Sequence, residues 1–475
     1  MNKKVPFFTF SSVVALSMIA TACGGSGSTP STSPSASTQA SASPSADAGK
    51  NASASPAAGG TITVLVNGAE SVGAGLADDA IKAKEAENQK NNKTDAVSTF
   101  SVNFTKIVND ALKKQNITLK YEDWGWSEPL VQKETAAFLA KQGPDVIVGE
   151  TQSPGFAVQG VLEPFPDWLA KEVRDNIVEA AWKPMEVNGK IYGVAPEPGV
   201  NNLYWNKKFL KASGLDPDKG PTTWKEWIEM SKKINDAGKG QFYAGGVYAG
   251  PNNGGYLRFG ALPLLSGGGF VDANNNPIFN SDKNVAAFEL IREMNKYNPK
   301  GLMPNNSEGP FWDAFQKDQI AFVVDGPWRV QSCKDLKQDC GMGQLPLPDG
   351  GKPGNVTIGA AFHSVPVYAK NKEAAWKYIQ AAIGIDAQKT IADANVRPPV
   401  NKKVAETDDY KSKHPELYQV YLAEKGNVQG LPTFNKDDTK AWQIYGEAMV
   451  KAMMTDSPVK DILDDAQKKV LQVTQ

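Results

Sequence analysis

The chain has 475 residues, of which 41% are hydrophobic and 22% charged, as in a globular protein rather than a disordered or fibrous one. Its 51 basic and 52 acidic residues give a formal net charge of −1, so it lacks the basic excess with which proteins neutralise nucleic-acid phosphates. With two histidines and three cysteines the chain offers few metal ligands, and we expect neither a metal nor a cofactor.

The N-terminal segment predicts an export signal followed by a lipid anchor. Two lysines precede an apolar run from Val5 to Ala20 that is too short for a comfortable membrane span. The sequence Ala20-Thr21-Ala22-Cys23 resembles a bacterial lipobox, although Ala20 stands where Leu is usual. We predict a signal peptide over residues 1–22 and a diacylated Cys23, because two acyl chains anchor a protein stably. The alternative is ordinary cleavage that leaves Cys23 as a free thiol.

Residues 23–60 predict a flexible tether. They consist almost entirely of Ser, Ala, Thr, Pro and Gly and contain no aromatic residue, so they cannot bury a core. A flexible coil of about 37 residues has a root-mean-square reach of about 33 Å. Such a tether suits a protein that stands off a membrane behind a thick wall, and we therefore expect a Gram-positive source.

The folded part begins with strands that alternate with helices. Thr61–Val66 and Ile117–Tyr121 are β-branched runs, and apolar residues recur at helical spacing from Phe104 to Leu112 between them. A helix from about Leu130 to Ala140 and a buried strand over Asp145–Val148 follow. This alternation predicts an α/β lobe, in which ligands collect at the carboxyl ends of the strands.

Three further segments carry local signals. The polar stretch from Gly73 to Ala96 predicts a loop insertion or a poorly packed helix. Thr223 and Glu226 have the spacing of a capping box at a helix start. Ser457-Pro458 predicts the start of the last helix, which carries an apolar stripe. The stripe consists of Ile462, Leu463, Ala466 and Val470.

Five segments, in the same order along the chain, resemble extracellular solute-binding proteins of the maltose-binding type. Each motif alone is weak, and their order carries the resemblance. They are GPDVIVGE (143–150), NGKIYGVAPEPGVNNLYWNKKFLKASGLDP (188–217), TTWKEWIEMSKKI (222–234), QIAFVVDGPWRV (319–330) and VPVYAKNKEAAWKYIQAAI (365–383).

The resemblance implies a two-lobe α/β fold of the periplasmic-binding-protein type II class, with hinge crossings and a central cleft. The N-terminal lobe would comprise residues 61–196 and 359–403, and the C-terminal lobe residues 197–358 and 404–475. The crossings would lie near Val194–Gly199 and Pro346–Ile358, and closure about them is the implied motion.

The implied function is that of a receptor of an ATP-driven importer. We expect a monomeric lipoprotein on the outer face of the cell membrane that binds a carbohydrate, an oligosaccharide in particular, and delivers it to the permease subunits of an ABC transporter, without catalysis and without nucleic acid. The alternatives are a receptor for a peptide, polyamine or anion on the same fold, a glycosidase that uses two carboxylates, and a purely structural surface lipoprotein.

A sugar ring presents apolar C–H faces and a belt of hydroxyls, so its site needs aromatic rings and polar side chains. Trp328 matches the family's Gly-Pro-Trp motif, whose tryptophan commonly stacks on the sugar. Trp124 and Trp126 follow a strand's carboxyl end and are candidates for a second ring, with packing on the lobe surface as the alternative. By contrast, Trp224, Trp227, Trp376 and Trp442 are expected in the core.

The polar candidates lie after the strand that ends at Val148, in the first crossing, in a Gly-rich segment and near a Pro-Pro pair. They are Glu150, Thr151, Gln152, Glu197, Asn201, Tyr256, Arg258 and Arg397. For Glu197 and Asn201 the alternative is a role in shaping the hinge. For Arg397 the alternative is an ion pair on the lobe surface.

Cys333 and Cys340 are seven residues apart in a chain that we expect to be exported. This spacing and compartment predict a local disulfide, which stabilises a loop of this length by about 2–3 kcal/mol. The alternative is a backbone geometry that keeps the two thiols apart.

Overall fold

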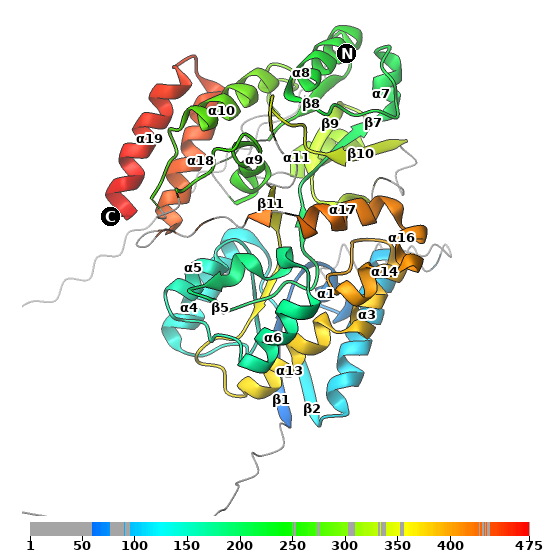
Figure 1. The fold of residues 1–475 in the computed structure, drawn as a ribbon, viewed down its shortest axis with the longest axis vertical. Coiled ribbons are helices and arrows are strands. Elements are labelled where there is room, and N and C mark those ends of the chain that lie inside the picture. Colours follow the sequence, from blue (N-terminus) through cyan, green and yellow to red (C-terminus); the bar gives the residue numbers. More distant parts are fainter. Residues whose placement is uncertain are drawn as a thin grey trace, which may run out of the picture. The chain divides into compact units, whose positions relative to one another are not determined.

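The computed structural model describes residues 59–76, 90, 96–248, 250, 253–272, 276–302, 309–330, 333, 339–351, 356–426, 428–429, 432, 434 and 438–474 (Figure 1). The predicted signal peptide, Cys23 and nearly all of the tether lie outside the described residues. Most of the polar stretch 73–96 also lies outside them.

The first sheet is built on two long parallel strands, β1 (Gly60–Val66) and β2 (Ile117–Asp123), paired from Gly60↔Ile117 to Val66↔Asp123. Strand β3 (Ile147–Gly149) lies on the other side of β1, and a parallel bridge between Val64 and Val146 attaches it. Strand β12 (Phe362–Ser364) pairs antiparallel with β3. The predicted strands are confirmed, although the third begins at Ile147 rather than Asp145.

Helices from distant parts of the sequence pack beside this sheet (Figure 1). Helix α3 (Ala96–Lys113) contacts α13 (Lys372–Ile383) and α14 (Ile385–Ala394). The predicted apolar stripe of α3 is buried, with Phe104 and Leu112 in one cluster with strand residues such as Ile62. Helix α4 (Ser127–Ala140) begins three residues before the predicted start.

The second sheet has the strand order β10-β7-β9-β8, with β7 (Asn202–Asn206) between β10 (Cys340–Gln344) and β9 (Ile320–Asp325). Both neighbours of β7 run antiparallel to it, and β8 (Tyr243–Gly246) runs parallel to β9. Helix α8 (Trp224–Gly238) packs against β8.

The capping box at the start of α8 is present as predicted. The Thr223 hydroxyl accepts a hydrogen bond from the Glu226 backbone N–H at 3.1 Å, and the Glu226 carboxylate accepts one from the Thr223 N–H at 3.3 Å. Three of the four tryptophans expected in the core, Trp227, Trp376 and Trp442, are buried, and Trp224 is half-buried.

The other helices and short strands, apart from those in the crossing segments, follow in chain order. They are α1 (Gly68–Gly73), α5 (Ser153–Val158), α6 (Asp167–Asn176), η1 (Glu179–Ala181), η2 (Lys183–Met185), β4 (Glu186–Val187), β5 (Lys190–Ile191), α7 (Lys207–Ala212), α9 (Asn253–Leu265), α10 (Asp282–Asn295), α11 (Gly309–Gln316), η3 (Pro327–Arg329), α15 (Lys402–Ala405), α16 (Asp408–Lys413), α17 (Pro415–Lys425), α18 (Asp438–Met454) and α19 (Val459–Thr474). Helix α19 begins one residue after Pro458 and buries the predicted stripe.

The two predicted crossing segments pair with each other. Strand β6 (Gly199–Val200) runs antiparallel to β11 (Val356–Gly359), and β13 (Val428–Gln429) runs parallel to β11. A side chain at Gly199 would place its Cβ 2.5 Å from Pro327 Cδ, so only glycine fits there. This close approach brings the first crossing against the Gly-Pro-Trp motif.

Two hydrophobic clusters form the core in the part of the chain that the structure describes. The smaller cluster contains residues of the first sheet and of the helices packed beside it. The larger cluster joins Leu65 and Ile147 of the first sheet to residues of the second sheet. Helix α17 contacts both clusters, because Tyr421 belongs to the smaller and Val420 to the larger. The lobe boundaries, including the one at residue 403, stay predictions.

Candidate functional site

Trp328 lies directly after the carboxyl end of β9, where Asp325 fixes its indole. The indole Nε1 donates to Asp325 Oδ1 at 2.8 Å, and the Gly326 N–H donates to the same oxygen at 2.8 Å. Asp325 Oδ2 accepts from Arg329 Nε at 2.7 Å. Burial alone would raise the pKa of Asp325, but Arg258 and Arg329 outweigh it and hold that pKa below its usual range. An ionised carboxylate therefore orients the indole.

Arg258 of α9 lies over the Trp328 ring. Its Cζ is 4.9 Å from the ring centroid, and Nη2 is 3.0 Å from Asp325 Oδ1. Nη1 donates to Asn201 Oδ1 at 3.0 Å. With 5% of the side chain exposed, Arg258 is a buried bridge between the first crossing and the end of β9.

Arg397, which follows α14, is a second guanidinium beside Trp328. Its Cζ is 5.4 Å from the ring centroid. Nη1 donates to the Glu197 carbonyl oxygen at 2.8 Å, and Nε lies 3.3 Å from Glu197 Oε2. Five of the predicted residues are therefore linked through the Trp328 ring and the two arginines beside it. We call Trp328, Arg258, Arg397, Glu197, Asn201 and Asp325 the Trp328 cluster.

Glu197 is the titratable member of this cluster near neutral pH. Burial raises its pKa to about 7, although the charge of Arg397 lowers it, and the carboxylate of Glu70 raises it further. The protein thus places a partly protonated carboxyl group beside the arginine that lies over the aromatic ring.

Trp126 and Trp124 differ in their surroundings. Trp126 is 46% exposed, and its Cζ2 would lie 3.0 Å from a Cβ at Gly68, so the indole covers the backbone at the end of β1. Trp124 is half-buried, packs against the larger core cluster and donates from Nε1 to Glu122 Oε2 at 2.9 Å. Of the two, Trp126 offers more ring surface at the strand ends.

Glu150, Thr151 and Gln152 follow β3 as predicted and are all half-buried. Gln152 Nε2 donates to Glu134 Oε2 at 2.8 Å. Burial raises the pKa of Glu134 to about 8, against the Gln152 hydrogen bond that lowers it. Gln152 is thus held by a carboxyl group that the sequence did not single out. Tyr256 lies on α9, and its side chain is outside the described part of the chain.

Several polar residues at the strand ends were missed by sequence reasoning. His363 Nε2 lies 3.1 Å from Glu70 Oε1, with 1% and 9% of the two side chains exposed. The Ser71 hydroxyl donates to Asp123 Oδ2 at 2.5 Å. The rule that ligands collect at the carboxyl ends of strands points to Glu70 after β1, whereas no local signal marks His363.

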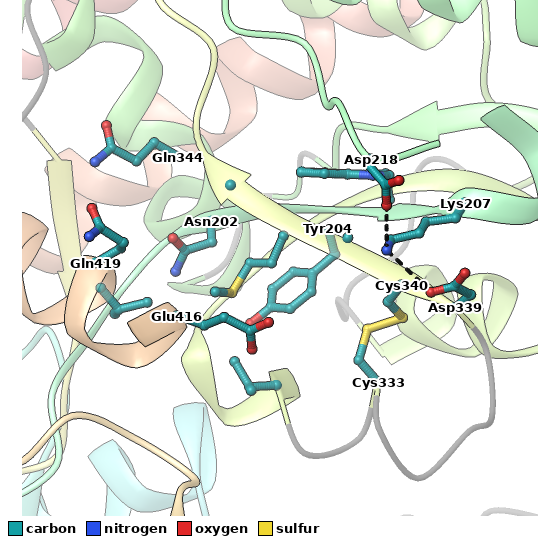
Figure 2. A pocket seen from close by; sticks show the side chains of 16 residues that line it. Asn202, Tyr204, Lys207, Asp218, Cys333, Asp339, Cys340, Gln344, Glu416 and Gln419 are labelled. Atoms are coloured by element: carbon teal, nitrogen blue, oxygen red, sulfur yellow. Dashed lines mark ion pairs between the residues drawn. A yellow bond between two sulfur atoms is a disulfide. The ribbon is translucent and has the colours of Figure 1, made fainter. Parts of the chain in front are cut away.

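A cavity of about 480 Å³ lies between β7, β10 and α17 (Figure 2). At one end Lys207 Nζ contacts Asp218 at 2.7 Å and Asp339 at 3.3 Å. At the other end are three amide side chains, Asn202, Gln344 and Gln419. Its volume lies in the range of small-molecule pockets. Within the described part of the chain, none of the eleven predicted ligand-binding residues lines it.

The disulfide Cys333–Cys340 lines this cavity (Figure 2). The two Cα atoms are 5.8 Å apart, within the ordinary range for such a bond. It joins the segment after η3 to the first residue of β10. The geometry thus permits the bond that the spacing predicted.

The described residues contain no group of three or more His, Cys, Asp or Glu side chains placed to hold a metal ion. No helix among them has the length and apolarity that crossing a bilayer requires.

Comparison with known proteins matches residues 106–417 to the family described as bacterial extracellular solute-binding protein. A curated relative, the maltooligosaccharide ABC transporter solute-binding lipoprotein of Streptococcus pneumoniae, is 24% identical over 288 residues. That match covers 59% of this chain and 64% of the relative, which is slightly under two thirds of its length.

Solved structures share the fold. A Thermotoga lettingae ABC transporter solute-binding protein bound to α-D-tagatose has a TM-score of 0.69 at 19% identity, with 87% of this chain and 100% of that one covered. UgpB of Mycobacterium tuberculosis with glycerophosphocholine has a TM-score of 0.68 at 18% identity, with 87% and 98% covered. Both are similar to this chain in architecture.

Proposed function

The chain belongs to the bacterial extracellular solute-binding protein family, and from this premise we propose that it is the carbohydrate-binding component of an ABC importer. The observation that carries the proposal is the Trp328 cluster. It joins an aromatic ring at a strand end to polar side chains from a crossing segment, from α9 and from the segment after α14. The named ligands of relatives, maltooligosaccharide and tagatose among them, support a sugar.

The chemistry of binding follows from the contacts. Trp328 and Trp126 stack on the apolar faces of sugar rings, and Glu150, Thr151, Gln152, Glu197 and Asn201 exchange hydrogen bonds with hydroxyls. The Asp325 bond to Trp328 Nε1 fixes the ring before the ligand arrives, which reduces the entropy lost on binding. An oligosaccharide long enough to reach both tryptophans is the ligand we propose.

Delivery requires two states of the protein. The ligand binds the closed arrangement of the lobes more tightly than the open one, and closure about the β6–β11 crossing buries it. The permease subunits then receive the ligand, and no bond in it is made or broken. A diacylated Cys23 and the tether 23–60 hold the monomeric protein at the outer face of a Gram-positive membrane.

A thermal-shift screen of a soluble form that starts near Gly59 tests the proposal. Maltotriose, arabinotriose and mannobiose at about 100 times their dissociation constants should stabilise the native state by about 2.7 kcal/mol if they bind it alone. We expect a rise in Tm with at least one of them and no consumption of that sugar during prolonged incubation. Turnover of the sugar would instead identify a glycosidase, and no shift with any sugar would contradict the proposal.

A second candidate, a receptor for a phosphorylated polyol, is favoured by the charge of the site. Arg258, Arg329 and Arg397 lie around two carboxyl groups, Asp325 and Glu197, and Glu197 is partly protonated near pH 7. This leaves an excess of positive charge that suits an anion. Glycerol 3-phosphate in the same screen distinguishes the two candidates, since a shift with it alone supports the anion receptor.

A further inference from the structure

Trp328 and its two arginines come from different parts of the chain. Trp328 and Arg258 both lie within residues 197–358, whereas Arg397 lies within residues 359–403. Both guanidinium groups are within the distance at which a cation attracts an indole face, at 4.9 and 5.4 Å from the ring centroid. The ring surface that a sugar would use is therefore already in contact with cations.

The two arginines are held with different strength. Arg258 makes an ion pair with Asp325 at 3.0 Å and a hydrogen bond to Asn201 at 3.0 Å, and its side chain is 5% exposed. Among the described residues Arg397 makes one hydrogen bond, to the backbone oxygen of Glu197, and its side chain is 21% exposed. Its 3.3 Å contact with Glu197 Oε2 lacks hydrogen-bond geometry, since that oxygen has no hydrogen-bond partner among the described residues. Arg397 is thus the guanidinium that can leave.

We propose that Arg397 is a displaceable latch, which covers Trp328 in the ligand-free protein and leaves when a ligand ring stacks there. The proposal rests on the proposed function, because it takes Trp328 as a ligand-stacking residue. A planar guanidinium lies against an aromatic ring as the apolar C–H face of a sugar ring does, so the two compete for one surface. The latch covers the stacking surface of the half-buried ring, and the ligand binds only after Arg397 has left.

The consequence for affinity has a definite sign. The ligand must replace the guanidinium on the ring, so removal of Arg397 should tighten binding by about two- to tenfold, the range expected for one cation–π contact. The gain should lie in the association rate, because the latch must leave before the ligand can stack. If Arg397 instead contacted the ligand directly, its removal would weaken binding.

The chain supplies a matched control. Arg174 also pairs with a glutamate, with Nη1 2.6 Å from Glu186 Oε1, and its Cζ lies 5.1 Å from the ring centroid of Trp182. None of these three residues belongs to the Trp328 cluster. Arg174→Ala therefore removes the same kind of contact at a place where no ligand is proposed to bind.

The first arm of the test needs no ligand. Hydroxyl-radical footprinting with peptide mass spectrometry measures the oxidation rate of Trp328 in the wild type, Arg397→Ala and Arg174→Ala. We expect about a twofold or larger rise at Trp328 in Arg397→Ala alone. An unchanged rate would overturn the latch. If the alanine variant does not fold, Arg397→Lys replaces it in the test. This variant keeps the charge without the planar face, so it should give an intermediate rise in the oxidation rate of Trp328.

The second arm measures binding of maltotriose, arabinotriose and mannobiose by calorimetry and stopped flow. Tighter binding and faster association in Arg397→Ala, with Arg174→Ala unchanged, support the latch. Weaker or unchanged binding in Arg397→Ala, while Trp328→Ala abolishes it, overturns the latch and leaves the proposed function standing. Binding that Trp328→Ala does not affect overturns both, because the ring is then not a binding surface.

Discussion

At the residue scale, the Trp328 cluster depends on one carboxylate. Asp325 accepts hydrogen bonds from the Trp328 indole, the Gly326 backbone and Arg329, and it pairs with Arg258. Because it is 3% exposed, losing either arginine would leave its charge uncompensated in a poorly solvated place. The Trp328 side chain is half-buried.

Replacing Trp328 separates the two roles of this ring. Trp328→Ala should weaken ligand binding by about tenfold or more, because the stacking surface is lost, and should leave the Tm of the free protein nearly unchanged. Calorimetry with the bound sugar and thermal unfolding of the free protein measure the two effects. A large loss of Tm with little change in affinity would assign Trp328 to the core.

At the element scale, helix α4 carries a buried carboxyl group against the end of β3. Glu134 is 1% exposed, accepts one hydrogen bond from Gln152, and its Oε1 has no partner among the described residues. Burial raises its pKa to about 8, so the group is protonated at neutral pH and serves as a neutral anchor for the loop after β3.

The pKa of Glu134 predicts the sign of a pH dependence. An unfolded Glu titrates near pH 4.3, so between about pH 4.5 and 8 the folded protein binds the proton that the unfolded chain has lost. The free energy of unfolding contributed by this group is therefore complete in acid and falls as pH rises, by about 5 kcal/mol over that window.

Glu134→Gln should flatten this decline, measured as the difference in urea unfolding free energy between pH 5 and pH 8. Glu229→Gln, at an exposed position of α8, is the control and should leave the wild-type slope intact. An equal slope in the wild type and in Glu134→Gln would show that Glu134 does not titrate in this range.

At the scale of the whole molecule, the folded part is held together by a core that joins its two sheets. Leu65 and Ile147 of the first sheet belong to the same hydrophobic cluster as Leu203 and Phe322 of the second. Strands β6 and β11, which lie in the two crossing segments, also pair with each other by backbone hydrogen bonds. We therefore expect the folded part to move as lobes about these crossings rather than as independent domains.

The tether and its anchor belong to the same scale. Cys23→Ala removes the thiol that we expect to carry the lipid, so the full chain should appear in the culture medium instead of with the cells, with its sugar affinity unchanged. Immunoblots of cell and medium fractions measure this. Retention on the cells at the wild-type level would rule out Cys23 as the anchor.

The sequence by itself determined the local elements and the family. Strand β1, the stripe of α3, the capping box of α8 and the burial of Trp227 all follow from periodicity and from side chains within one or two turns. The Gly-Pro-Trp motif marked Trp328 for a similar reason, because its residues are adjacent in the chain.

Only the tertiary structure decided which polar groups face one another. Arg397 and Glu197 are 200 residues apart, and Glu70 and His363 are 293 apart, so no local pattern pairs them. The pKa of Glu197 near 7 likewise depends on burial by several elements at once. Burial and long-range contacts arise only when the chain packs, and they bring the candidate residues together into one site.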